Sequence, residues 1–341
     1  MNITVLTYLE KEDDPKSYDL VVDQVAEALR SLNHEVSILG VHGDIERLTN
    51  GLTRRQPDLV FNLMETFGDT HLGQVAVTGL LELAGVRYTG CGPGEYYLQE
   101  DKSTTKKLLA FDKIAFPDFA VFSTDADFET GGNLHLPFFV KPLRMDASIG
   151  IDGKSLVRTT KEMLQRVAAI HKLNDAALVE EYVDGREFLV SVLGNSQPEA
   201  LPPIEIDFSG MPEGMPKVLD AKAKWDKRSK QYKGTKAIFP ILDDELRARL
   251  EKVAVDAYRA LRVRDYGRVD LRMAETGELY VIEVNASCYL EKDSEFARSA
   301  KEAGMDYPQL LQRIADLAME RYKVKSKPES KKRKDEAAQA V

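Results

Sequence analysis

Apolar positions in the first hundred residues switch between strand-like and helical spacing. Residues 3–6 form a short apolar run that predicts a strand, 21–32 repeat apolar side chains with helical periodicity, and 35–39 alternate like a second strand. Another apolar run at 59–63 predicts a third strand. Strands and a helix in this order predict a small parallel α/β lobe that ends near residue 95.

After the glycine-rich break at 90–94, the chain is predicted to mix strands with longer helices. Helices are predicted at 102–111 (capped by Asp101 or Ser103), 243–262 and 307–322, and strands at 138–141, 177–182, 188–193, 201–207, 268–273 and 278–285. The last two strands form a hairpin around Gly277. The segment from Lys323 onward has few apolar residues, so we expect a disordered tail.

Composition narrows the possible function classes. The chain has 341 residues, 43% of them hydrophobic and 30% charged, which is typical of a globular protein with two or three lobes. Its net charge of −9 argues against a nucleic-acid partner, and the basic run at 331–334 is better explained as a solvated terminus. Two distant cysteines, Cys91 and Cys288, suit a reducing compartment. Without a basic leader or a membrane-length apolar run, we expect a soluble cytoplasmic protein with no membrane partner.

The predicted hairpin carries the clearest candidate chemistry. Residues two apart in a strand share a face, so Arg268, Asp270 and Arg272 line one face of its first strand. Glu283 and Asn285 line one face of its second strand. Two explanations stay open: an internal network of arginine–carboxylate ion pairs, or a Mg²⁺ site of carboxylate and amide oxygens that substrate phosphates complete.

Three other segments admit both a structural and a binding interpretation. Lys141 ends an apolar strand beside the small-residue loop 143–151, where its ammonium could meet a phosphate or simply lie at the surface. The carboxylates within 178–187 could bind adenine and ribose or be solvated. The basic segment 217–236 is either a solvated loop or a lid over an anionic ligand. A Walker A loop is excluded, because Ser148 occupies the position of its first glycine.

Taken in order, these segments resemble the D-alanine–D-alanine ligase family of ATP-grasp enzymes. The resemblance runs from about Pro57 to Leu317 and includes 58–63, 79–82, 88–90, 101–102, 138–150, 178–193, 267–285 and 303–305. It implies an α/β (α+β ATP-grasp) fold with a parallel N-terminal α/β lobe at 1–98, a central ATP-binding lobe at 99–186, a C-terminal ATP-grasp lobe at 187–322 and the tail at 323–341.

The resemblance also implies a role for individual residues. Its ATP-binding residues are Lys102, Lys141 and Ser148 for the phosphates, Glu180, Glu181 and Val183 for adenine, Glu187 for the ribose and Lys224 for the γ-phosphate. Asp270, Glu283 and Asn285 would hold two Mg²⁺ ions, with Mn²⁺ as a possible replacement, and Glu283 would bridge them. Arg268 would stabilise the developing oxyanion and, with Lys224, act in catalysis. Glu65, Tyr289 and Ser294 would lie at the substrate.

The activity implied is ATP- and Mg²⁺-dependent joining of a carboxylate to an amine through an acyl phosphate, by a homodimer acting on amino acids or peptides. The sequence departs from the family pattern at the amino-acid end. At 7–14 it lacks the glycine-rich loop, Glu65-Thr66 replaces histidine-glycine, Asp146-Ala147 replaces glycine-serine, and Cys288-Tyr289 replaces proline-glycine. We therefore expect a changed substrate pair. The alternatives are a true D-alanine–D-alanine ligase and a non-catalytic nucleotide-binding regulator.

Overall fold

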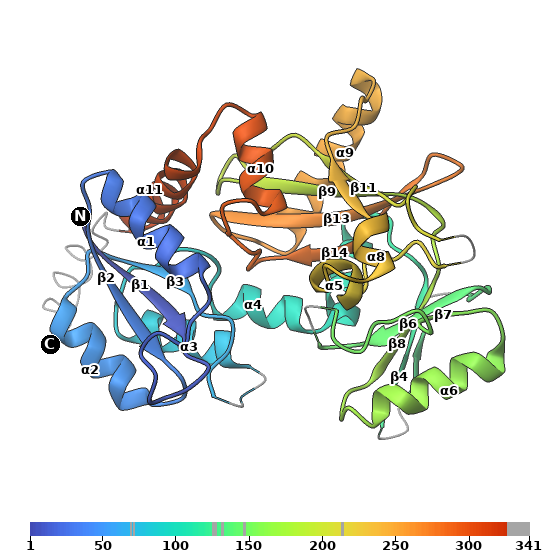
Figure 1. Ribbon diagram of the computed structural model, residues 1–341, viewed down its shortest axis with the longest axis horizontal. Helices are drawn as coiled ribbons and strands as arrows, with labels where there is room; N and C mark the ends of the chain where they lie inside the picture. Colours follow the sequence, from blue (N-terminus) through green and yellow to red (C-terminus); the bar gives the residue numbers. More distant parts are fainter. Residues whose placement is uncertain are drawn as a thin grey trace, which may run out of the picture.

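The computed structural model describes residues 1–68, 70, 72–124, 128–130, 133–145, 148–212 and 215–325. Among these residues the strands form three sheets, which Figure 1 shows side by side with helices around them. The expected mixed α/β fold is confirmed. Within the part of the chain that the structure describes, no helix is both long and apolar enough to cross a membrane. His71, Asp146 and Ala147 lie outside the described residues.

The N-terminal lobe is built on a parallel sheet in which β1 lies between β2 and β3. Its predicted strands and first helix are confirmed, but a second helix was not expected because its sequence is polar. That helix begins because the Asp44 side chain accepts hydrogen bonds from the Glu46 and Arg47 amides. The elements are β1 (Asn2–Tyr8), α1 (Val21–Ser31), β2 (Glu35–Val41), α2 (Ile45–Arg55), β3 (Leu59–Leu63) and α3 (Gly73–Leu83).

The second sheet is antiparallel, in the order β5-β4-β8-β6-β7, and α6 packs against it through Met163, Val167 and Ile170. Asp101 caps α5 by accepting from the Ser103 and Thr104 amides, as predicted. The elements are α4 (Pro93–Glu100), α5 (Lys102–Phe111), β4 (Phe119–Phe122), β5 (Phe128–Thr130), β6 (Phe138–Pro142), β7 (Leu156–Val157), α6 (Thr160–His171) and β8 (Ala177–Glu181).

The third sheet, in the order β12-β11-β9-β13-β14 with β10 beside β9, holds the predicted hairpin. Helix α9 buries Leu250, Ala254 and Ala257 in the core shared with this sheet. The elements are β9 (Gly185–Leu193), β10 (Glu199–Ala200), β11 (Ile204–Asp207), α7 (Ala221–Trp225), α8 (Lys230–Gly234), β12 (Lys236–Ile238), α9 (Asp244–Ala260), β13 (Tyr266–Ala274), β14 (Leu279–Asn285), α10 (Glu295–Glu302) and α11 (Tyr307–Lys325).

Three expectations about element boundaries are corrected. The segment 217–236 contains α7 and α8 rather than one continuous loop, because the Asp220 and Ser229 side chains cap these short helices. The strand expected at 201–207 begins only at Ile204, after two prolines that cannot donate to a ladder. The last helix continues to Lys325, so 323–325 are helical, while the rest of the expected tail, 326–341, lies outside the described residues.

A buried carboxylate joins the N-terminal lobe to the third sheet. Asp265 is fully buried and accepts hydrogen bonds from the Gly90 amide, from Asn195 and from the Arg321 guanidinium on α11. Arg321 also donates to the Tyr88 carbonyl. In Figure 1 the red helix α11 lies beside the blue helix α1, and their apolar side chains share one core. The two lobes therefore meet through both polar and apolar contacts.

Candidate active site

The hairpin brings its predicted residues onto one face. Arg268 pairs directly across from Asn285, and Asp270 from Glu283. The Arg268 guanidinium donates to both oxygens of Asp270, from Nε at 2.7 Å and Nη2 at 2.9 Å, and Asn285 Nδ2 lies 3.3 Å from Asp270 Oδ2. A bulge follows Asp270 and shifts the register of the next pairs. The structure thus places three oxygen-bearing side chains and one arginine together, as the alternation of residues predicted.

Charges around this face keep the second carboxylate ionised. Burial alone would raise the pKa of Glu283, but Lys102, Lys141 and Lys224 outweigh it and lower that pKa. The Lys102 ammonium lies 3.7 Å from a Glu283 oxygen. For Asp270 burial prevails and raises the pKa, with Arg268 opposing. Lys224 of α7 acts on both carboxylates, so the predicted lid lysine does lie close to the hairpin.

A second cluster of charges lies where β6 and β8 pair. Glu180 is 3% exposed, and its two oxygens each lie 2.8 Å from a lysine, Oε1 from Lys106 and Oε2 from Lys141. Burial would raise the pKa of Glu180, but the two ammonium groups lower it to about 2. Lys106 was not predicted as a site residue. Its spacing of four from Lys102 puts both on one face of α5, a regularity that the sequence does contain.

The predicted adenine and ribose residues lie at the junction of β8, β9 and β13. Glu181 accepts from the backbone amide of His135 at 2.6 Å and lies 2.8 Å from its imidazole. Glu187 accepts from Arg272, which pairs with it across the two strands and also donates to the Val183 carbonyl at 3.2 Å. Arg272 is 5% exposed, so a buried arginine holds both Glu187 and the Val183 carbonyl in place.

Ser148 links the predicted phosphate loop to the predicted lid. Its hydroxyl donates to the Leu219 carbonyl at 3.2 Å, one residue before the cap of α7. Its backbone has a φ of 61°, in the left-handed region that is uncommon for a non-glycine residue. The Lys102 ammonium donates to the Met145 carbonyl at 3.0 Å on the other side of this loop. Two residues of this loop are therefore held by hydrogen bonds, Met145 by the lysine that also lies beside Glu283 and Ser148 by the residue before the α7 cap.

The residues predicted to lie at the amino-acid substrate are found where the N-terminal lobe meets the segment after β14. The Tyr289 hydroxyl donates to Asp19 at 2.7 Å, and burial together with Asp19, Glu291 and Glu65 raises the pKa of Tyr289. Glu65, at the end of β3, therefore lies within electrostatic reach of Tyr289, while Ser294 uses its oxygen to cap α10. Glu65 thus acts electrostatically on Tyr289, while no hydrogen bond links Ser294 to either among the described residues; Ser294 caps α10 and its amide donates to the Glu291 carbonyl.

Two glutamines of the N-terminal part hold the same segment and were not predicted. Gln99 accepts from the Ala286 amide at 2.6 Å, and Gln74 lies 3.3 Å from the Ser287 hydroxyl. Neither residue belongs to a recognisable motif, so only the folded chain shows that they contact the residues after Asn285. The wall of the amino-acid end therefore depends on contacts between distant parts of the sequence.

The residues present fit a magnesium–nucleotide complex. The oxygens of Asp270, Glu283 and Asn285 are the ligand type that Mg²⁺ prefers, and phosphates commonly complete such sites. Around them, the described residues bring together five cationic side chains and three carboxylates, an excess of positive charge that suits a polyphosphate. The set consists of Lys102, Lys106, Lys141, Lys224, Arg268, Glu180, Asp270 and Glu283.

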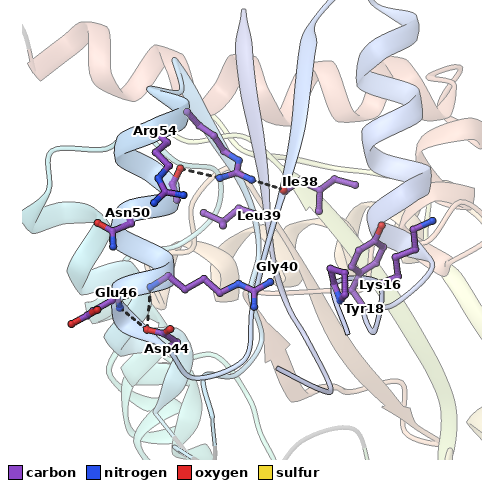
Figure 2. Close-up of a pocket in the computed structure, with 13 residues that line it drawn as sticks. Lys16, Tyr18, Ile38, Leu39, Gly40, Asp44, Glu46, Asn50 and Arg54 are labelled. Atoms are coloured by element: carbon purple, nitrogen blue, oxygen red, sulfur yellow. Dashed lines mark hydrogen bonds between the residues drawn. The ribbon is translucent and has the colours of Figure 1, made fainter. Parts of the chain in front are cut away.

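A hollow of about 580 Å³ in the N-terminal lobe lies apart from these residues (Figure 2). It is bordered by β2, α2 and the loop around Lys16, and none of its lining residues is a predicted site residue. Two of its three arginines are engaged within the lobe: Arg47 lies 3.3 Å from Glu12, and Arg55 donates to the Ile38 and Gly51 carbonyls. We assign no chemistry to this hollow.

Comparison with known proteins identifies the family. Residues 108–316 match the model of the D-ala D-ala ligase C-terminus. The chain belongs to the D-alanine–D-alanine ligase family. It is 33% identical to the D-alanine–D-alanine ligase of Desulforudis audaxviator over 87% of this chain and 92% of that protein. It is also 33% identical to the uncharacterised protein y4sG of Sinorhizobium fredii, over 89% and 88% of the two chains.

Solved structures show that the ATP-grasp fold of this family extends over almost the whole chain. The D-alanine–D-alanine ligase of Bacillus anthracis complexed with ATP superimposes with a TM-score of 0.74 at 21% identity, covering 95% of this chain and 99% of that one. The VanG D-Ala:D-Ser ligase of Enterococcus faecalis gives 0.70 at 22% identity, covering 93% and 100%. As a family member the chain is an ATP-grasp ligase that joins a carboxylate to an amine.

Proposed function

We propose that this ligase uses ATP and Mg²⁺ to activate the carboxylate of an amino acid or peptide as an acyl phosphate, which an amine of a second substrate then attacks. The observation that carries this proposal is the facing arrangement of Asp270, Glu283 and Asn285 beside Lys102 and Lys141. Oxygen ligands next to converging ammonium groups suit the two parts of a magnesium–nucleotide complex.

The chain's own residues would hold and orient the nucleotide. Lys102, Lys141 and Lys224 neutralise the phosphates, and the loop containing Ser148 covers them. Glu181 and the Val183 backbone bind adenine, Glu187 binds the ribose, and Glu180 lies in the same site. This assignment is supported by their clustering at the junction of β8, β9 and β13, which Arg272 holds together. Phosphoryl transfer depends mainly on alignment and charge neutralisation, so no nucleophilic side chain is needed.

Arg268 is the proposed oxyanion-stabilising residue. Two hydrogen bonds to Asp270 fix the plane of its guanidinium, and Asp270, opposing the effect of burial, raises the pKa of Arg268 so that it stays charged. A fixed cation next to the acyl carbon stabilises the negative oxygen that forms when the amine attacks. Asp270, Glu283 and Asn285 would hold two Mg²⁺ ions, or Mn²⁺ in their place, and bound metal supplies further neutralisation of the phosphate charge.

The substrates are proposed to differ from a pair of D-alanines. The amino-acid end is bordered by Glu65, Tyr289 and Ser294, and the ring of Tyr289 is anchored to Asp19 of the other lobe. A tyrosine here fills space that a glycine would leave open to the backbone. Two amino acids, or an amino acid and a peptide, remain the substrate class that suits a carboxylate–amine ligase.

The division into lobes, the dimer and the cellular location are also proposals. The lobes at 1–98, 99–186 and 187–322 each centre on one of the three sheets. Dimerisation through the N-terminal lobe follows from the family resemblance. A cytoplasmic location agrees with Cys91 and Cys288, which are both buried free thiols.

Release of ADP tests the proposed function. Purified protein with MgATP would be offered pairs of D- and L-amino acids and dipeptides, and products would be identified by mass spectrometry. We expect ADP and a new amide only when a carboxylate and an amine are both supplied, with little product from D-alanine alone. A blank across the whole panel would overturn the proposal, and efficient D-alanyl-D-alanine formation would overturn the changed substrate pair.

A further inference from the structure

The cluster of Lys106, Glu180 and Lys141 contains two positive charges and one negative charge. All three side chains are at most 4% exposed, and they come from α5, β8 and β6. One carboxylate faces two ammonium groups at equal distances of 2.8 Å. Taken alone, the triad has a net charge of +1 in a volume that water scarcely reaches. Asp118 interacts electrostatically with Lys106, and Glu283 with Lys141, so these carboxylates offset part of that buried charge.

The surroundings of Lys106 show that it cannot serve a ligand directly. Its ammonium lies 5.2 Å from the centre of the Phe116 ring and 5.6 Å from that of Phe119, and it also approaches the Pro117 carbonyl at 3.4 Å. These groups and Glu180 surround its charged end. Lys106 can therefore act on a bound nucleotide only through Glu180 and Lys141.

Lys141 is the member of the cluster that can reach outward. Its ammonium has three N–H donors and directs one at Glu180 Oε2, and its charge also lowers the pKa of Glu283 on the hairpin. Lys141 therefore lies between the buried carboxylate and the site proposed for the phosphates. How strongly Glu180 attracts Lys141 depends on how far Lys106 already neutralises that carboxylate.

We propose, resting on the nucleotide site assigned above, that Lys106 is a positioning residue for ATP: it neutralises Glu180 so that the charge of Lys141 remains available to the phosphates. Without Lys106, Glu180 and Lys141 form a neutral one-to-one pair, and the attraction of Lys141 for an anion falls. The buried excess charge disappears in the same step, so the ligand-free fold does not lose stability in proportion. If Lys106 only stabilised the fold, its loss would instead lower the stability of the ligand-free protein and leave its ATP affinity unchanged.

The test compares ATP binding and thermal unfolding in the full-length protein. The variants are Lys106→Met, Lys106→Arg and, as a matched control one position along the same helix, Lys107→Met, whose side chain is exposed. The dissociation constant of MgATP would be measured by isothermal titration calorimetry, with no amino-acid substrate needed. We expect Lys106→Met to raise it about tenfold, equivalent to about 1.4 kcal/mol. Lys107→Met should match the wild type, and Lys106→Arg should recover part of the affinity.

A double variant separates positioning from folding. Lys106→Met with Glu180→Gln leaves Lys141 without its carboxylate partner. Because Glu180 also belongs to the proposed adenine site, the probe for this variant is the magnesium complex of tripolyphosphate, which has no adenine, and we expect its affinity to return toward that of the wild type. The proposal is overturned if Lys106→Met binds MgATP like the wild type, or if the double variant binds magnesium tripolyphosphate more weakly than Lys106→Met does. If the wild type itself does not bind ATP, the proposed nucleotide site fails. If only the variants contradict expectation, the role of Lys106 fails and the site stands.

Discussion

The proposed nucleotide end and the proposed amino-acid end of the site are built in different ways. At the nucleotide end, Lys141 and Glu180 are buried on paired strands, and Lys106 reaches them from a helix packed alongside. At the amino-acid end, Glu65 is exposed at a strand end, and Tyr289 lies in a loop that meets Asp19 of another lobe. The proposed nucleotide end lies in the interior of the fold, and the proposed amino-acid end lies where two lobes meet.

The difference shows where sequence change is tolerated. A buried carboxylate cannot be left without any cation cheaply, so Glu180 constrains the lysines that neutralise it. Loop residues where two lobes meet are constrained by fewer neighbours, so their identity can change when the substrate changes. This agrees with the departures from the family pattern around Glu65 and Tyr289. The charged residues of the proposed nucleotide site follow the pattern, and the departure at that end is Asp146-Ala147 in the predicted phosphate loop.

The largest effect is expected from Arg268→Met. Removing the proposed oxyanion donor should lower kcat by about 10²–10³-fold. Steady-state ADP release would measure this, and the exposed Arg249→Met serves as the control. A kcat within twofold of the wild type would remove Arg268 from the catalytic machinery.

Glu180→Gln should change how stability depends on pH. The folded-state pKa of Glu180 is lowered to about 2 from the ordinary 4.5, so its stabilising contribution is complete above pH 4.5 and lost as the pH falls toward 2. Relative to the variant, the wild type should lose about 3 kcal/mol of unfolding free energy over that window. Urea unfolding at a series of pH values measures the difference, and parallel curves for the two proteins would contradict the burial of an ionised Glu180.

Glu283→Gln should weaken the metal site more than it weakens the fold. We expect the Mg²⁺ concentration for half-maximal ADP release to rise about 10–100-fold, and chelation of the metal to abolish release from the wild type. Binding of Mn²⁺, followed by electron paramagnetic resonance, gives a second readout that is independent of turnover. Glu278→Gln, in the exposed turn of the same hairpin, should leave both values unchanged.

Tyr289→Phe should give the smallest effect, and it should change amino-acid binding without changing ATP binding. Losing the hydrogen bond to Asp19 removes about 1.5 kcal/mol at most, so KM for an amino-acid substrate should rise up to about tenfold. The dissociation constant of ATP should not move. If ATP binding weakens as much as amino-acid binding, the two ends are not independent. Tyr97→Phe, at an exposed tyrosine, controls for loss of a hydroxyl.

The sequence predicted those parts of the fold and site that depend on local spacing. The side-chain period of two in strands grouped Arg268 with Asp270 and Glu283 with Asn285, and one of the two predicted caps, Asp101, does begin α5. It did not predict α2, whose polar surface and central Gly51 conceal the helical pattern. It also did not show whether the charges on the hairpin attract one another or a metal.

Contacts between distant segments escaped prediction because no local rule encodes them. The adenine role of Glu180 stays a prediction. What the sequence did not predict is that its carboxylate lies between two lysines, one of them from a helix about seventy residues earlier. Gln74 and Gln99 approach the loop after Asn285 only because the lobes pack together. The helical spacing of Lys102 and Lys106 was visible in the sequence, but its meaning depended on knowing where Glu180 lies.

The contact between Tyr289 and Asp19 has a consequence for how such enzymes diversify. Gln24 of α1 adds to it by hydrogen bonding both the Glu291 side chain and the Lys292 amide. Exchanging the first hundred residues for those of a relative would therefore replace the side chains that hold Tyr289, Glu291 and Lys292 while leaving the proposed nucleotide-binding residues unchanged. Recombination at the lobe boundary could create new pairings of amino acids in one step, provided that the incoming lobe brings a partner for the tyrosine.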